Sequence, residues 1–167
     1  LKAIVVRKLT DAQIIKRADL LRTDSVHGAF KGVVDVDLEN QAIIVNGQVI
    51  KFIEGSNPED TDYTIHGINN ALVIDNTGAF TDKESLSRHL QAKGVNKVLL
   101  TAPGKGIPNI VYGINSNDLD IDNTDIFSAA SCTTNCIAPI LQVVEEKYGI
   151  EKGHLETVHS YTSDQNL

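Results

Sequence analysis

Two cysteines lie four residues apart in a Ser/Thr-rich stretch, Ser128-Ala-Ala-Ser-Cys-Thr-Thr-Asn-Cys136. A short apolar run precedes this stretch and apolar residues recur at helical spacing after it, which predicts a strand that turns into a helix. Ser131 and Thr133 carry side-chain oxygens of the kind that cap backbone N–H groups at a helix start. Cys132 would then face unpaired amides and the positive end of the helix dipole, a position that favours the nucleophilic thiolate.

Two other interpretations of this stretch remain open at this point. A single cysteine is more often a small buried hydrophobe than a nucleophile, and we assign that role to Cys136, which an apolar run follows. A metal site would need further ligands, and no His or Cys stands nearby at ligand spacing, so none is expected. Pro139 should bend the helix, or else the regular helix begins only near Ala138.

The stretch 128–139 resembles the active-site signature of phosphorylating glyceraldehyde-3-phosphate dehydrogenases. A second segment, residues 156–165, resembles the active-site histidine segment of the same family. A histidine in a strand is by itself more often structural than catalytic, but the two matched segments together favour catalysis for His159. The resemblance thus implies catalytic roles for Cys132 and His159, and anion-binding hydroxyls on Ser131, Thr133 and Thr162.

The family's chemistry gives the expected function. The resemblance implies an NAD(P)-dependent dehydrogenase that oxidises glyceraldehyde 3-phosphate with inorganic phosphate through a thioester on Cys132, and a cytoplasmic homotetramer. Two alternatives stay open. One is a dehydrogenase for another phosphorylated or acidic aldehyde, and the other is a non-catalytic piece that serves as a binding partner or scaffold.

Three short segments are expected at the cofactor, NAD or NADP. Thr77 and Gly78 follow an apolar strand and resemble the family's Ser-Thr-Gly-x-Phe loop, while Thr101 opens a segment similar to its Ser/Thr-x-Pro loop. Glycine after a strand lets the backbone approach a ligand closely. No G-x-G-x-x-G turn is present. Arg7 and Lys8 follow the first strand, where the family often has an acidic ribose ligand, and two cations there would attract a 2′-phosphate.

Strands and helices alternate along most of the chain, which predicts an α/β fold. We expect a Rossmann-like, mostly parallel sheet with an inserted antiparallel meander, incomplete at both ends. Residues 1–131 would form a partial NAD(P)-binding domain, and residues 132–167 would begin the catalytic domain. The expected strands are 1–6, 32–39, 42–45, 48–53, 71–75, 95–100, 109–114, 125–128 and 154–160, with helices at 11–22, 83–92 and after Cys132. Asn46-Gly47 predicts a hairpin, and Thr81 with Glu84 has capping-box spacing.

Composition excludes several classes of function. The 167 residues carry a formal net charge of −7, which argues against sequence-independent nucleic-acid binding. No apolar run reaches the roughly 18 residues of a membrane span. Two cysteines make no disulfide framework, which favours a reducing compartment. The chain lacks methionine, and we expect it to be an internal part of a longer protein, inactive as a dehydrogenase on its own.

Overall fold

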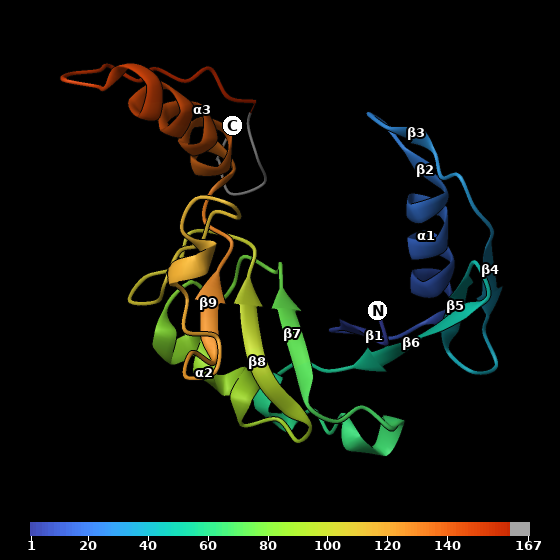
Figure 1. Ribbon diagram of the computed structural model, residues 1–167. Helices are drawn as coiled ribbons and strands as arrows, with labels where there is room; N and C mark the ends of the chain where they lie inside the picture. Colours follow the sequence, from blue (N-terminus) through green and yellow to red (C-terminus); the bar gives the residue numbers. More distant parts are fainter. Residues whose placement is uncertain (161–167) are drawn as a thin grey trace. The chain divides into compact units, whose positions relative to one another are not determined.

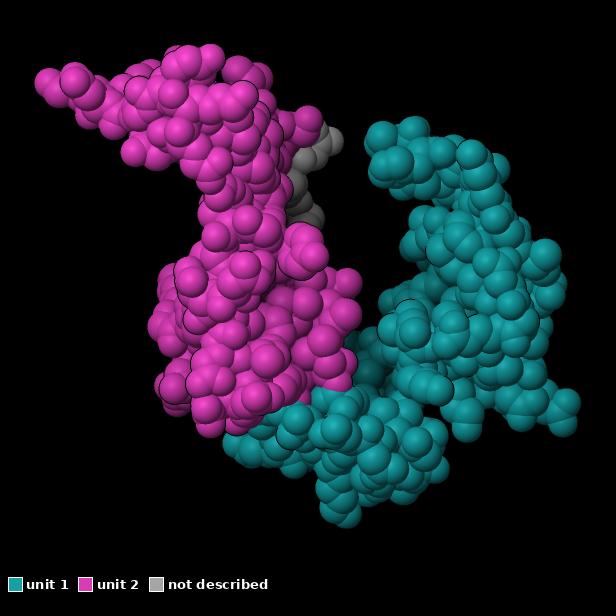
Figure 2. Space-filling model, in the orientation of Figure 1, with its two compact units in different colours: residues 1–71, 88–96 teal, residues 72–87, 97–167 magenta. Residues whose placement is uncertain are grey.

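The computed structural model describes residues 1–160 and divides into two compact units. The first unit comprises residues 1–71 and 88–96, and the second comprises residues 72–87 and 97 onward (Figure 2). Each unit contains a sheet of its own, so each is described separately. No helix within residues 1–160 combines the length and hydropathy needed to cross a membrane.

The first unit is built on a four-stranded mixed sheet in the order β1-β6-β5-β4 (Figure 1). Strand β1 pairs in parallel with β6, whereas β6, β5 and β4 form an antiparallel meander. The meander of the expected fold is therefore present, and it is attached to the parallel strand β1. The bounds are β1 Ala3–Val6, β4 Val34–Asp37, β5 Ala42–Val45 and β6 Gln48–Glu54, with a short ladder of β2 Thr23–Asp24 and β3 Gly28–Ala29.

The β5–β6 hairpin confirms the turn predicted at Asn46-Gly47. Val45 pairs with Gln48, so Asn46 and Gly47 alone form the loop between the two strands. Their φ angles are 50° and 82°, both in the left-handed region. A two-residue hairpin with both φ angles positive matches the right-handed twist of the strands, and Asn-Gly adopts that geometry at low cost.

Helix α1, Asp11–Arg22, connects β1 to the rest of the first unit. Thr10 caps the helix, because its side chain accepts a hydrogen bond from the backbone N–H of Gln13. Ile14 and Ala18 are buried in a cluster with apolar side chains of the mixed sheet. Two 3₁₀ helices follow the meander, η1 Pro58–Asp60 and η2 Thr64–His66.

The second unit carries the sheet that positions the candidate site. Its strands are β7 Ala71–Asp75, β8 Val95–Leu100 and β9 Ile126–Ser128, in the order β7-β8-β9. Strand β8 pairs in parallel with β9, and Figure 1 draws all three arrows in one direction. Their carboxyl ends therefore meet at one edge, where ligands bind in open α/β sheets. The other elements are α2 Lys83–Leu90, η3 Ser116–Asp118 and α3 Cys132–Tyr148.

Two predicted strands are absent from the structure. Residues 109–114 make one isolated bridge, Asn109 to Ser128, and then turn, because the Asn115 side chain accepts from the Val111 N–H and bends the chain back. Residues 154–160 have no regular structure and their side chains are exposed. Alternation of side-chain types predicts a strand only where a neighbouring strand supplies the hydrogen bonds.

One helix start differs in detail from the prediction, and a second agrees with it. The cap of α2 is Asp82 rather than Thr81, since the Asp82 carboxylate accepts from the N–H of Ser85 at 2.9 Å. Helix α3 begins at Cys132 and contains Pro139, so the regular helix starts before Ala138.

Candidate active site

The strand-to-helix transition predicted around Cys132 is present between β9 and α3. Ser131 is the N-cap of α3, and its hydroxyl accepts a hydrogen bond from the N–H of Thr134 at 3.0 Å. The Ser131 and Thr134 hydroxyl oxygens also lie 2.7 Å apart. Cys132 is therefore the first residue of the helix, where backbone N–H groups lack helical partners and the dipole is positive.

Cys132 faces His159 across a short distance. The Sγ atom of Cys132 lies 3.2 Å from Nε2 of His159, 27 residues later in the chain. The other ring nitrogen, Nδ1, lies 2.6 Å from the carbonyl oxygen of Ser160. A carbonyl can only accept, so Nδ1 carries a proton in every state of the ring. Nε2 is then free to accept the thiol proton or, once protonated, to donate to the thiolate.

The electrostatics of this pair favour charge separation. The pKa of Cys132 is lowered, first by the hydrogen bond from His159 and then by the hydroxyl and backbone N–H of Thr133. The pKa of His159 is raised, first by the hydrogen bond to the Ser160 carbonyl and then by Cys132. Both groups are solvent-exposed, so salt screens their attraction. The arrangement favours a thiolate beside an imidazolium, the activated form of a cysteine nucleophile.

The predicted anion-binding hydroxyls are placed as follows. Ser131 and Thr133 are half-buried and flank Cys132 in sequence, Ser131 as the cap and Thr133 as the second helical residue. Thr162 lies outside the described residues. The roles of all three in binding phosphate stay predictions.

Cys136 differs from its predicted environment. The prediction makes it a packed, buried thiol, but the structure exposes it together with Cys132. The reason lies in α3, in which no residue is buried, so the described residues cover the apolar positions of the helix at most in part. Within residues 1–160 no group of three His, Cys, Asp or Glu side chains could hold a metal ion.

Asp75 joins two of the predicted cofactor segments and was missed by the sequence reasoning. Its buried carboxylate accepts from the N–H and the hydroxyl of Thr77, both at 2.8 Å. Its backbone carbonyl accepts from the N–H of Thr101 at 3.0 Å and from the Thr101 hydroxyl at 3.2 Å. Thr77 and Thr101 are thus held at neighbouring strand ends. An aspartate that ends a strand two residues before a threonine is the signal that could have found it.

Gly78 leaves the backbone open at this edge of the sheet. Its φ angle is 73°, and a Cβ placed there would meet no atom within 4 Å. The positive φ explains why glycine occupies the position, and the open space leaves room for a ligand to approach the main chain.

Arg7 and Lys8 lie in the first unit, after the last residue of β1 and before α1. Both side chains are exposed. Glu54, at the carboxyl end of the neighbouring strand β6, accepts a hydrogen bond from the N–H of Leu9 at 2.7 Å. This edge therefore holds two cations beside one carboxylate, and its role toward a cofactor stays a prediction.

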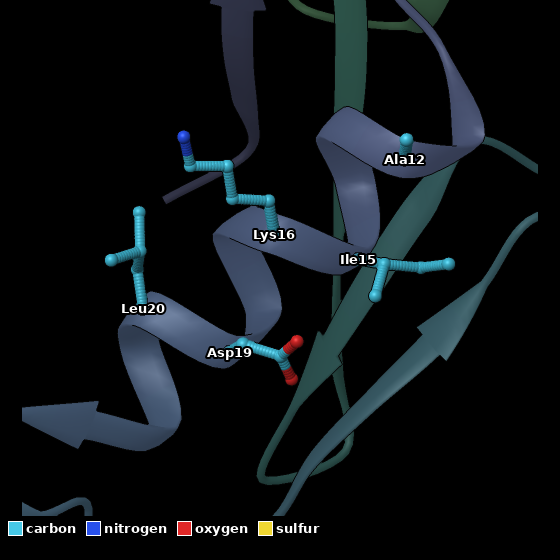
Figure 3. A pocket seen from close by; sticks show the side chains of 5 residues that line it. All are labelled: Ala12, Ile15, Lys16, Asp19 and Leu20. Atoms are coloured by element: carbon cyan, nitrogen blue, oxygen red, sulfur yellow. The ribbon is translucent and has the colours of Figure 1, made fainter.

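Two of the cavities on the described surface differ in whether candidate site residues line them. One, of about 480 Å³, runs along the outside of α1, and Figure 3 shows its side chains Ala12, Ile15, Lys16, Asp19 and Leu20. None of these is a candidate catalytic residue. The other, of about 440 Å³, lies in the second unit between the loop after β8 and the start of α3. Its lining includes the helix cap Ser131 and Thr134, so it adjoins the predicted nucleophile.

Comparison with known proteins agrees with the geometry. Residues 1–83 match the glyceraldehyde 3-phosphate dehydrogenase NAD binding domain, and residues 131–167 match the C-terminal domain of the same enzyme family. The chain belongs to the glyceraldehyde-3-phosphate dehydrogenase family. The division at residues 131 and 132 into two domains stays a prediction.

Individual relatives resemble the chain along its whole length. It is 54% identical over 168 residues to a glyceraldehyde-3-phosphate dehydrogenase-like protein of Pseudomonas aeruginosa. That match covers 100% of this chain and 36% of the relative. The enzyme of Clostridium pasteurianum is 40% identical over 99% of this chain and 48% of its own length. A chloroplastic glyceraldehyde-3-phosphate dehydrogenase A of Zea mays is 46% identical over 95% of this chain and 39% of its own length. The chain thus spans less than half of each relative.

Proposed function

We propose that the full-length protein oxidises glyceraldehyde 3-phosphate to 1,3-bisphosphoglycerate with NAD(P) and inorganic phosphate. The observation that carries this proposal is the contact of 3.2 Å between Cys132 Sγ, at the first residue of α3, and Nε2 of His159. Oxidation of an aldehyde through a covalent adduct requires a nucleophile that adds to the carbonyl carbon before hydride leaves it, so a thiolate and a group that moves protons must lie side by side.

The first step is the attack of Cys132 on the aldehyde. The thiolate sulfur forms a bond to the carbonyl carbon, and the π electrons move to the oxygen. The imidazolium of His159 donates its Nε2 proton to that oxygen, which gives a neutral thiohemiacetal on Cys132. The backbone N–H groups at the start of α3 are further donors for the developing oxyanion.

The oxidation and the phosphate step complete the cycle. Bound NAD(P) supplies the hydride acceptor. The C–H bond of the thiohemiacetal breaks with its electron pair as hydride leaves for that acceptor, and the hydroxyl proton returns to Nε2 of His159. The carbonyl thereby re-forms as a thioester on Cys132. A phosphate oxygen then adds to the thioester carbon, the carbon–sulfur bond breaks and the thiolate returns. Ser131, Thr133 and Thr162 are proposed to hold the attacking phosphate.

The residues at the strand ends of the second unit fit a dinucleotide. Gly78 leaves its backbone uncovered, and the bonds to Asp75 fix Thr77 and Thr101 at the carboxyl edge of the sheet. Open backbone at that edge is the feature that such a cofactor requires. We therefore propose that these residues bind it.

The charges at the end of β1 support the use of NADP as well as NAD. Arg7 and Lys8 are exposed where an acidic residue would repel a 2′-phosphate, and cations there attract it instead. The Glu54 carboxylate at the same edge opposes that attraction, which is why we propose mixed use and not NADP alone.

We also propose a glycolytic role, a cytoplasmic location and a homotetramer. These rest on the family resemblance and, for the location, on the small number of cysteines. Light scattering of the purified full-length protein tests the tetramer, and fractionation of cells tests the location.

The activity itself is tested by substitution at the two cysteines. In the full-length protein, Cys132→Ser should abolish phosphate-dependent reduction of NAD(P) by glyceraldehyde 3-phosphate, while Cys136→Ala should keep most of it. Another phosphorylated aldehyde as the better substrate would redirect the proposal, and full activity of Cys132→Ser would refute it.

A further inference from the structure

The turn between β9 and α3 contains an unusual backbone conformation. Ala130 has a φ angle of 59° and is buried. A side chain with a Cβ atom is disfavoured in this left-handed region, and such a conformation persists only where surrounding contacts fix it. Because Ala130 lies two residues before Cys132, whatever fixes it also sets where the thiol points.

The strand side of the turn is fixed by Ser128. Its fully buried hydroxyl donates to the carbonyl oxygen of Ala102 at 2.5 Å and accepts from the N–H of Ala130 at 2.9 Å. The N–H of Ala129 is also bonded, to the carbonyl oxygen of Leu100 at 2.8 Å. The backbone N–H groups of Ala129 and Ala130, at the start of the turn, are thus both hydrogen-bonded to residues of the sheet.

The helix side of the turn is fixed by Asn135, which lies one helical turn into α3. Its side-chain nitrogen Nδ2 donates to the carbonyl oxygen of Ala129 at 2.7 Å and to that of Ser131 at 2.9 Å. Both neighbours are acceptors, so the amide can only present its NH₂ group to them. One side chain therefore holds the carbonyls on both sides of Ala130.

We propose that Asn135 is a positioning residue for the Cys132 nucleophile. Neither of its described side-chain hydrogen bonds is to the sulfur or to His159. By clamping the carbonyls of Ala129 and Ser131 it fixes Ala130 in the left-handed conformation and Ser131 as the helix cap. Cys132 consequently starts the helix with its sulfur toward His159. The inference rests on the proposed function only in taking Cys132 as the nucleophile, and its test reads the thiol directly.

The experiment measures iodoacetamide labelling of Cys132 against pH in the full-length protein, with Cys136→Ser present so that one of these two thiols reports. Asn135→Ala removes the clamp, and we expect its labelling profile to move to higher pH, with the rate at pH 7 at least about threefold lower, because labelling follows the thiolate fraction. Gln142→Ala is the matched control. It removes a side-chain amide two turns along α3 whose described bond is to Glu146, and it should leave the profile unchanged.

A second variant separates positioning from plain stabilisation. Asn135→Gln retains an NH₂ donor and should restore part of the labelling rate, whereas a loss of stability alone would lower the melting temperature and leave the pH profile in place. A wild-type profile in Asn135→Ala would overturn the proposal. Should that variant fail to fold, Asn135→Ser carries the same test. The unsubstituted protein reports separately on the proposed function, since labelling only at the pH of an ordinary thiol would count against Cys132 itself.

Discussion

Removal of the imidazole of His159 should make Cys132 a markedly weaker nucleophile at neutral pH. The hydrogen bond from His159 is the largest of the effects that lower the pKa of Cys132, and the charge of His159 adds to it. In His159→Asn both are lost, while the contributions of Thr133 remain. The pKa of Cys132 should therefore rise, and the onset of its reaction with iodoacetamide should move to higher pH.

The size of the effect follows from the distance and the exposure. An opposite charge within about 4–6 Å favours the thiolate form, and the Sγ–Nε2 separation of 3.2 Å is shorter than that limit. Both side chains are exposed, so solvent and salt weaken this interaction. We expect the labelling rate of Cys132 at pH 7 to fall severalfold, because labelling follows the thiolate fraction.

The assay again needs Cys136→Ser in the background, since the exposed Cys136 would otherwise react as well. Rates are measured between about pH 5.5 and 9.5, at low and high salt. His154→Asn is the matched control, because it removes a histidine from the same irregular segment. Among the described residues, the histidine that contacts Cys132 is His159 and not His154. An unchanged labelling profile in His159→Asn would refute the ion-pair reasoning.

Three further outcomes are expected. The double variant Arg7→Asp, Lys8→Ala should lower the ratio of kcat/KM for NADP to kcat/KM for NAD by about tenfold or more, because a charge-assisted bond to phosphate contributes roughly 1.5–3 kcal/mol. A strict NAD preference in both the unsubstituted protein and the double variant would contradict the proposed mixed use. Ser131→Ala should destabilise the start of α3 by about 0.5–2 kcal/mol through loss of its cap, which hydrogen exchange at the helix start would detect, and unchanged protection there would argue against the cap. Gly47→Ala should lower the free energy of unfolding, measured in urea, by about 1–2 kcal/mol because Gly47 has a positive φ. Gly153→Ala should have little effect, because the φ of Gly153 lies outside the left-handed region and no atom lies near an added Cβ.

The sequence by itself determined the local elements whose signals lie within a few neighbouring residues. The Asn46-Gly47 hairpin, the helix 11–22 and the strands 71–75 and 95–100 all appear as predicted. Turn residues and apolar periodicity act over one or two turns of chain, so they operate before any long-range contact forms. The Ser-Cys-Thr-Thr stretch belongs with them, because a cap and the first helical residues are a local matter.

The tertiary structure decided what depends on partners distant in sequence. Residues 109–114 and 154–160 have strand-like patterns, but in the described structure the first segment meets β9 at a single bridge, from Asn109 to Ser128, and the second forms no ladder. The apolar run after Cys136 is typical of a buried thiol, yet burial requires other elements packed against α3. Asp75 shows its importance only when β7 and β8 lie side by side, and the contact between Cys132 and His159 joins residues 27 apart. Burial and side-chain contact are properties of the assembled chain, so residue types could name the candidates for this site while only the fold could bring them together.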